Sequence, residues 1–179
     1  MERTGHVGYV RGDRYQMIRL PYRGGRFAMY VVLPDKGTPA ASVEQQFATR
    51  GMPGSLVQKD FREVHLVLPR LHAELSYDLA PALQALGIQS AFDCERADFS
   101  GLATKVAGIG LCIAKVAQSV YLDVDEEGTE AAAVTGLLMV TTTALGPPPI
   151  EFIVDRPFLF LLRDEQTGAD LFVGTIRRP

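Results

Sequence analysis

The chain has 179 residues, of which 47% are hydrophobic and 22% are charged, and its formal net charge is -3. These proportions exclude a wholly disordered chain and match one soluble globular domain. No Lys/Arg cluster stands out, so the sequence implies neither nucleic acid nor an anionic membrane as a partner. The longest uncharged run, residues 131–150, contains three prolines and two glycines, which makes it a poor membrane-spanning helix.

The first elements expected along the chain are a hairpin and a helix. Residues 15–22 and 26–34 are apolar, β-prone runs separated by Arg23-Gly24-Gly25, which predicts two antiparallel strands joined by a tight turn. Residues 42–50 have helical spacing, with Ser42 expected as the N-cap.

The middle of the chain predicts a strand, a short helix and a long strand. Residues 63–74 form the first strand, with Pro69 at a bulge or at the strand's end. Residues 78–86 have one apolar helical face, and Gly87 provides the stop. Residues 111–125 are rich in apolar and β-branched side chains, typical of a strand buried on both faces. Three more strands are expected near the C-terminus, at 150–154, 158–162 and 171–176.

The stretch Asp125–Thr143 joins an acidic turn to a long uncharged tail. Its far end is β-branched, which favours an extended conformation. Ala131, Ala132 and Ala133 are good helix formers, so the alternative is the first turn of a helix capped by Thr129. Composition alone leaves these two interpretations even.

Two motifs resemble one family. Glu126-Glu-Gly-Thr-Glu-Ala-Ala-Ala resembles the hinge of the serpins, protease inhibitors whose reactive loop inserts into their own central sheet. Residues 152–162, Phe-Ile-Val-Asp-Arg-Pro-Phe-Leu-Phe-Leu-Leu, are similar to the family's C-terminal signature, and Thr167-Gly168 and Leu171-Phe-Val-Gly174 follow. Milder similarity extends back to about Gly8 and corresponds to the C-terminal half of a serpin.

The resemblance implies an α+β fold: strands of the central sheet, strands of a small barrel-like sheet, few helices and a reactive loop at 126–149. Residues 1–179 are expected to be one serpin domain without its N-terminal half. Asp98–Gly101 is similar to a short helix of the family. The strand at 111–124 is expected beside the segment around 64–71, and nothing upstream of Tyr15 is long enough to be its other neighbour.

The resemblance assigns the hinge to Glu126, Gly128, Thr129, Glu130, Ala131, Ala132 and Ala133. Because the hinge must enter a sheet, Thr129, which is expected to turn into it, and the three alanines need to be small and uncharged. Counting a standard inhibitory loop from Glu126 places the scissile bond between Thr142 and Thr143, with Val140 and Thr141 as neighbours left open. Prolines 147–149 favour polyproline II and stiffen the far end, or are merely a linker.

Two further positions correspond to family features. Arg70 stands where the family has a basic residue that pairs with the hinge glutamate, so Arg70 and Glu126 form a candidate latch. The alternative is an ordinary surface charge worth ~0–1 kcal/mol. Gln118 stands where the family usually has a histidine at the centre of the main sheet, which weakens any histidine-dependent role there.

Catalytic and metal chemistry is not expected. His6, His65 and His72 lack ligand spacing, and no phosphate loop or Gly-x-Ser-x-Gly elbow occurs. Cys94 and Cys112 are expected to be free thiols, with a disulfide as the less favoured alternative. The sequence therefore implies no cofactor, no metal and no enzymatic activity.

The function expected from the resemblance is suicide-type inhibition of a serine protease. The uncharged tail favours an elastase-like or subtilisin-like target, and the missing N-terminal half is the other expected partner. The alternatives are a non-inhibitory serpin-like binding scaffold and an inactive truncated fragment. Alanine- and arginine-rich composition with few lysines suggests a bacterial source, no signal peptide opens the chain, and the family favours an extracellular location.

Overall fold

The computed structural model describes residues 1–51, 60–102, 110–124 and 147–179. These residues divide into two compact units, which are described separately. The first unit contains residues 1–71 and 124–179, and the second contains residues 72–123.

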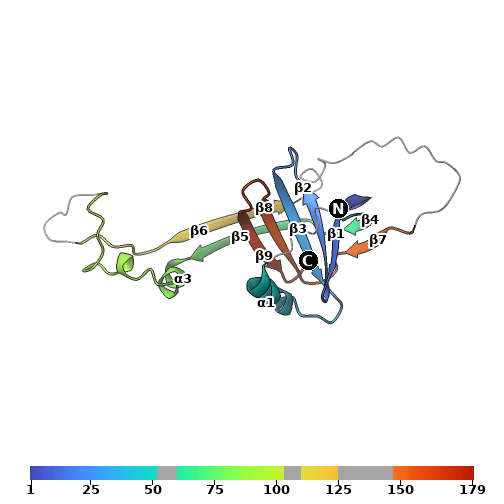
Figure 1. The fold of residues 1–179 in the computed structure, drawn as a ribbon. Coiled ribbons are helices and arrows are strands. Elements are labelled where there is room, and N and C mark those ends of the chain that lie inside the picture. The colour runs from blue at the N-terminus through green and yellow to red at the C-terminus, as the bar shows by residue number, and fades with distance from the viewer. Residues whose placement is uncertain (52–59, 103–109, 125–146) are drawn as a thin grey trace. The chain divides into compact units, whose positions relative to one another are not determined.

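The first unit is built on a seven-stranded sheet (Figure 1). The strand order is β7-β4-β1-β2-β3-β8-β9, and the β4–β7 pair is parallel, whereas the other neighbouring pairs are antiparallel. The strands are β1 (Glu2–Gly12), β2 (Tyr15–Pro21), β3 (Phe27–Pro34), β4 (Phe61–Val67), β7 (Ile150–Ile153), β8 (Phe158–Asp164) and β9 (Asp170–Ile176).

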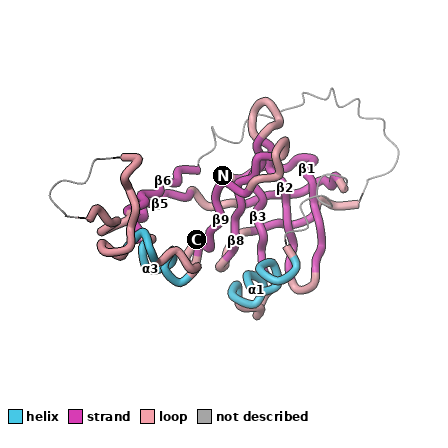
Figure 2. Tube along the Cα trace, turned by 60° about the vertical axis from the view of Figure 1, so that its left-hand side comes forward, coloured by secondary structure: helices cyan, strands magenta, loops and turns pink. Residues whose placement is uncertain are grey.

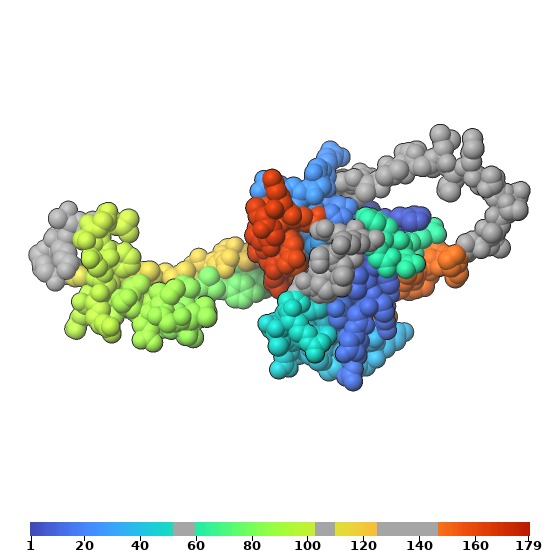
Figure 3. Space-filling view, viewed as in Figure 1, coloured from blue at the N-terminus to red at the C-terminus, as the bar shows by residue number. Residues whose placement is uncertain are grey.

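The core of this unit lies on both faces of its central strands. In β3 every residue after Phe27 is buried, as expected for an apolar run with a partner on each side. On one face, Tyr30 and Val32 share a cluster with Val43 of helix α1 (Ala40–Arg50), and Phe47 packs against it. Figures 2 and 3 show α1 beside the strands of this unit. The alternate residues of β3, such as Val31, are buried on the opposite face.

The predicted hairpin at residues 15–34 is confirmed. Strands β2 and β3 pair antiparallel with Leu20 opposite Met29, and the turn between them is closed by a hydrogen bond from Tyr22 N to Phe27 O of 2.9 Å. Gly24 and Gly25 have φ values of 86° and 70°, a region that favours glycine. Turn chemistry visible in the sequence therefore sets this register.

The second unit contains a two-stranded sheet and short helical segments. Strand β5 (Leu71–Asp78) pairs with β6 (Ala117–Val124), and between them lie α3 (Ala80–Ala85) and the 3₁₀ turn η1 (Ser90–Phe92). The side chain of Asp78 accepts a hydrogen bond of 3.0 Å from Ala80 N at the start of α3. Gly87, with φ 99°, follows its end as the sequence predicted.

Several predicted element boundaries are wrong. The predicted strand at 63–74 is divided by Pro69, which has no N–H to donate, into β4 and β5. Helix α1 begins three residues earlier than expected: its N-cap is the extended Pro39 instead of Ser42, and the hydroxyl of Ser42 donates to Pro39 O over 2.8 Å. Asp98–Gly101 contributes to a turn, with Leu102 N donating to Phe99 O, rather than to a helix.

The predictions for the strand before the hinge also need correction. Regular pairing starts only at Ala117, and most of β6 is exposed rather than buried on both faces, because β5 is its one partner among the described residues. That partner is Leu71–Asp78 and not the segment around 64–71. Upstream of Tyr15, β1 has 11 residues, but it pairs with β2 and β4.

Candidate functional site

The candidate site is the loop at residues 126–149. The residues expected to form its hinge, Glu126 and Gly128 to Ala133, and its expected scissile pair, Thr142 and Thr143, lie outside the described residues. The structure does describe the strands on either side of the loop, β6 before it and β7 after it, together with Arg70 and Gln118.

Strand β6 leads into the loop and ends at Val124. Gln118 lies near its start and is exposed. The ring of Tyr121 meets that of His72 on β5 edge-on, with centroids 5.5 Å apart, which is the kind of cross-strand pair that stabilises a two-stranded sheet. The Tyr121 hydroxyl donates to Asp123 Oδ2 over 3.0 Å, and this hydrogen bond to a carboxylate raises the pKa of Tyr121.

Strand β7 receives the chain after the loop. It pairs in parallel with β4, with Val64 opposite Ile150, and the side chain of Phe152 is fully buried. Just beyond β7, Val154 N donates to Val67 O over 2.8 Å, and Arg156 Nε donates to Pro34 O over 2.7 Å. The far end of the loop is thus attached to the seven-stranded sheet by an apolar anchor and by hydrogen bonds.

Charged groups flank the start of β7. The imidazole of His65 on β4 lies between two carboxylates: its Nε2 is 3.1 Å from Glu2 Oε1, and its Nδ1 is 3.6 Å from Glu151 Oε1. Both glutamates are largely exposed, so these contacts add little to stability. Beyond β7, Arg156 donates to Asp155 Oδ1 over 2.6 Å, which lowers the pKa of Asp155.

Arg70 lies between β4 and β5 and is exposed. It stands just before the boundary at which the chain passes from the first unit to the second, and its expected partner Glu126 is outside the described residues. The pairing therefore stays a prediction.

Neither a metal-binding group of side chains nor a membrane-spanning helix occurs in the part of the chain that the structure describes. Residues 1–51, 60–102, 110–124 and 147–179 contain no group of three His, Cys, Asp or Glu side chains arranged for a metal ion. Among the same residues, no helix combines the length and the apolar character needed to cross a membrane.

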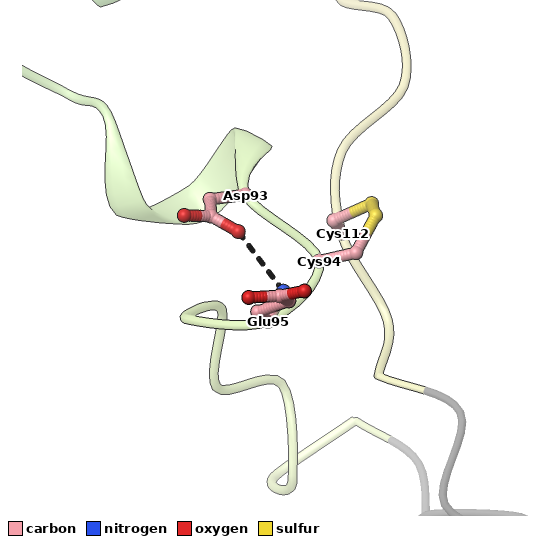
Figure 4. The surroundings of a disulfide bond; sticks show 4 residues. All are labelled: Asp93, Cys94, Glu95 and Cys112. Carbon is pink, nitrogen blue, oxygen red and sulfur yellow. Dashed lines mark hydrogen bonds between the residues drawn. A yellow bond between two sulfur atoms is a disulfide. The ribbon is translucent and has the colours of Figure 1, made fainter.

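One feature of the second unit was missed by sequence reasoning. Cys94 and Cys112 form a disulfide, which corrects the expectation of free thiols (Figure 4). The two residues are 18 positions apart, and nothing in that spacing shows that the turn after η1 meets the segment before β6. Only the folded second unit brings them together.

Comparison with known proteins gives one consistent family. The model of the serpin family, described as serine protease inhibitor, matches residues 1–179. The chain is 36% identical over 178 residues to Serpin B8 of Bos taurus and 34% identical over 178 residues to leukocyte elastase inhibitor A of Mus musculus, which cover 97% and 96% of this chain. The fold matches that of native protease nexin-1, crystallised with heparin, with a TM-score of 0.80, 30% identity and 99% of this chain covered.

These matches also show how much of a serpin the chain represents. It spans about 46% of each of these relatives and 46% of the nexin chain. The expectation of a C-terminal half is therefore confirmed, as is the α+β serpin fold. The two named relatives are mammalian, so they give no support to the bacterial source suggested by composition.

Proposed function

The chain belongs to the serpin family, and we propose that it is the C-terminal half of an inhibitor that traps serine proteases as a suicide substrate. The observation that carries the proposal is the hinge-like sequence of residues 126–133, which ends in three alanines and stands in the chain between β6 and the anchored strand β7. A matching family model over the whole chain supports the same assignment.

The proposed reaction uses the protease's own catalytic groups. The protease serine attacks the carbonyl carbon of Thr142, the new C–O bond forms an ester, and the C–N bond to Thr143 breaks as its nitrogen takes up a proton. The cut loop then inserts into the central sheet before water reaches the ester. The inhibitor contributes a cleavable loop and a conformational change, so no catalytic residue of its own is required.

Small hinge side chains suit this insertion. Ala131, Ala132 and Ala133 can enter between two strands without the ~1–3 kcal/mol that overpacking costs at a crowded site. Thr129 is small and uncharged, as a residue that turns into the sheet must be. A helix capped by Thr129 would instead leave these residues outside the sheet.

The proposed targets are elastase-like or subtilisin-like proteases. No Lys or Arg occurs between Glu130 and Glu151, so a trypsin-like specificity pocket would find no cation there. The names of relatives such as leukocyte elastase inhibitor A support the same class of target.

The second proposed partner is the N-terminal half of the protein. Strand pair β5–β6 exposes large apolar side chains at Leu75, Tyr77 and Tyr121, which are 47%, 47% and 61% exposed. A two-stranded ribbon is marginal by itself in water. We infer that strands and helices of the N-terminal half cover this ribbon and complete the sheet into which the loop inserts, with Gln118 at its centre and Arg70 pairing with Glu126.

The test is incubation of the full-length protein with elastase, subtilisin and trypsin. The expected result is a complex with elastase or subtilisin that survives boiling in detergent, since an ester bond persists where a non-covalent complex separates. A covalent complex with trypsin alone would contradict the proposed specificity. Loop cleavage by all three enzymes without any covalent complex would show a substrate or a binding scaffold instead of an inhibitor.

A further inference from the structure

The disulfide joins two segments that the sequence keeps apart. Cys94 follows η1, and Cys112 lies in the extended segment 110–116 that precedes β6. Their Cα atoms are 4.6 Å apart, within the range that a disulfide spans. Figure 4 shows Cys94 in a turn in which Asp93 Oδ1 accepts a hydrogen bond of 3.0 Å from Glu95 N.

The backbone around the disulfide is closely packed. A Cβ placed on Gly110 would lie 2.1 Å from the carbonyl oxygen of Cys94, so only glycine permits the chain to pass at this distance. On the other side of Cys112, Ile113 N donates to Ala91 O over 2.9 Å. Residues 110–113 therefore lie along residues 91–94, with the disulfide between two close backbone contacts.

The same segment is held again where β6 begins. Leu79 N donates to Val116 O over 2.8 Å, and Val116 N approaches Asp78 Oδ1 at 3.4 Å. The entry to β6 is thus fixed at two places, one covalent and one made of hydrogen bonds. Cys94 is exposed, so a reductant can reach the covalent attachment from solvent.

We propose that the Cys94–Cys112 disulfide is a redox-sensitive staple: a dithiol that reduces it releases the segment entering β6 and loosens the strand that leads into the reactive loop. The last clause rests on the proposed function of residues 126–149; the release of the segment does not. Disulfides persist in oxidising compartments and are reduced where dithiol systems operate. The staple would therefore be closed in an oxidising compartment and open in a reducing one.

The chemistry is ordinary thiol–disulfide exchange. One thiolate of the dithiol attacks a cysteine sulfur, the S–S bond breaks, and a mixed disulfide forms. The second thiolate of the dithiol displaces the remaining cysteine as its own sulfurs join in a ring. The protein gains two electrons and two protons as thiols, and the dithiol is oxidised to the cyclic disulfide.

The experiment is amide hydrogen exchange of the full-length protein with and without dithiothreitol, with alkylation and mass spectrometry counting the thiols. Reduction is expected to speed exchange of the Ile113 and Leu79 amides by roughly tenfold or more, because loop closure no longer restricts the open state. The amides of Tyr30 and Val31 in the other unit are expected to remain unchanged. Full reduction without faster exchange at Ile113 would overturn the proposal, as would two free thiols before any reductant is added.

Two sets of variants make the test specific. Cys94→Ser/Cys112→Ser should exchange fast at Ile113 with or without dithiothreitol; if it does not fold, the parent protein's response to reduction still decides. Gly110→Ala should make the disulfide easier to reduce, whereas Gly101→Ala, where a Cβ would meet nothing within 4 Å, should not. Equal reducibility of these two variants would contradict the close approach at Gly110.

Protease trapping separates the staple from the proposed function. Weaker covalent trapping by the reduced protein supports control of the loop, and equal trapping by both forms would refute it. If neither form traps a protease, the proposed inhibition fails, while the exchange at Ile113 still decides whether the staple exists.

Discussion

Arg26 and Asp164 are joined across the β3–β8 pair by two hydrogen bonds to the same carboxylate oxygen. Arg26 Nη2 is 2.7 Å and Nε is 3.0 Å from Asp164 Oδ2, and the Asp164 side chain is only 5% exposed. Its other oxygen accepts hydrogen bonds from the backbone N–H groups of Gln166 and Thr167. This contact closes the turn between β8 and β9, where Gly168 N donates to Asp164 O over 2.8 Å.

The pair predicts a specific acid sensitivity. The hydrogen bonds from Arg26, helped by those from Gln166 and Thr167, lower the pKa of Asp164 to about 2. Because the folded pKa is below the unfolded one, the stability it contributes is present above about pH 4 and is lost as pH falls through about 2. Asp164→Asn should therefore be less stable than the parent at pH 6, and the difference should shrink as pH approaches 2. Urea unfolding at several pH values measures this. Asp60→Asn, which removes a carboxylate from an exposed pair with Arg62, is the comparison variant for the loss of a surface charge. A constant difference for Asp164→Asn would contradict the assignment.

A second buried contact fixes the same turn to the sheet. Glu165 accepts hydrogen bonds from Arg19 Nε over 2.7 Å and from the hydroxyl of Tyr30 over 2.6 Å, and Arg19 and Glu165 are 13% and 9% exposed. Removing one partner leaves the other charge uncompensated, so Glu165→Ala should lower the unfolding free energy by ~3–5 kcal/mol. Tyr30→Phe should cost ~1.5–3 kcal/mol in the parent and less in Glu165→Ala. Urea midpoints of the single and double variants test this, and simple additivity would show that the groups do not act together.

The hinge predicts how inhibition would fail. Thr129→Arg should turn inhibitor into substrate, because inserting an unpaired guanidinium into the sheet costs several kcal/mol and stalls the loop. Cleavage should continue while covalent trapping stops, as denaturing gels of elastase reactions would show. Thr135→Arg places the same cation at a second position of the loop, beyond the alanines. Comparing the trapping by the two variants shows whether the effect depends on the position of the charge. Undiminished trapping by Thr129→Arg would disprove the role given to Thr129.

The exposed ribbon β5–β6 predicts the behaviour of residues 1–179 expressed alone. Leu75, Tyr77 and Tyr121 are exposed, and among the described residues β5 and β6 pair only with each other. The chain should therefore be oligomeric or poorly soluble and should trap no protease. Adding a separately made N-terminal half should partly restore solubility and protease trapping. Light scattering and a trapping assay measure this. A monodisperse monomer that traps protease alone would show that the ribbon needs no cover.

Local chemistry made part of the fold predictable. Gly24 and Gly25 correctly predicted the turn of the β2–β3 hairpin, and Gly87 correctly predicted the end of α3. Strand β1 was missed because Gly5 and Gly8 interrupt its β pattern, and its stability comes from pairing with β2 and β4 on either side.

The residues of the candidate site were assigned from motifs more than from hydrophobic periodicity. Arg70 and Gln118 were assigned by resemblance, and no local rule points to either. The Cys94–Cys112 disulfide could not be predicted, because it depends on how two loops meet in space. The small residues of the hinge allow both a helix and an inserted strand, and only the neighbouring motifs favour the strand.

The most direct test of suicide inhibition is the mass of the complex between the full-length protein and elastase or subtilisin. The predicted mass is that of protease plus inhibitor, less the peptide that begins at Thr143, and mapping should place the protease serine in an ester with Thr142. Attachment one residue earlier would only shift the count along the loop. Cleavage outside Val140–Ala144 would reject the register, and two uncombined masses with an intact or simply cut loop would contradict the proposed mechanism.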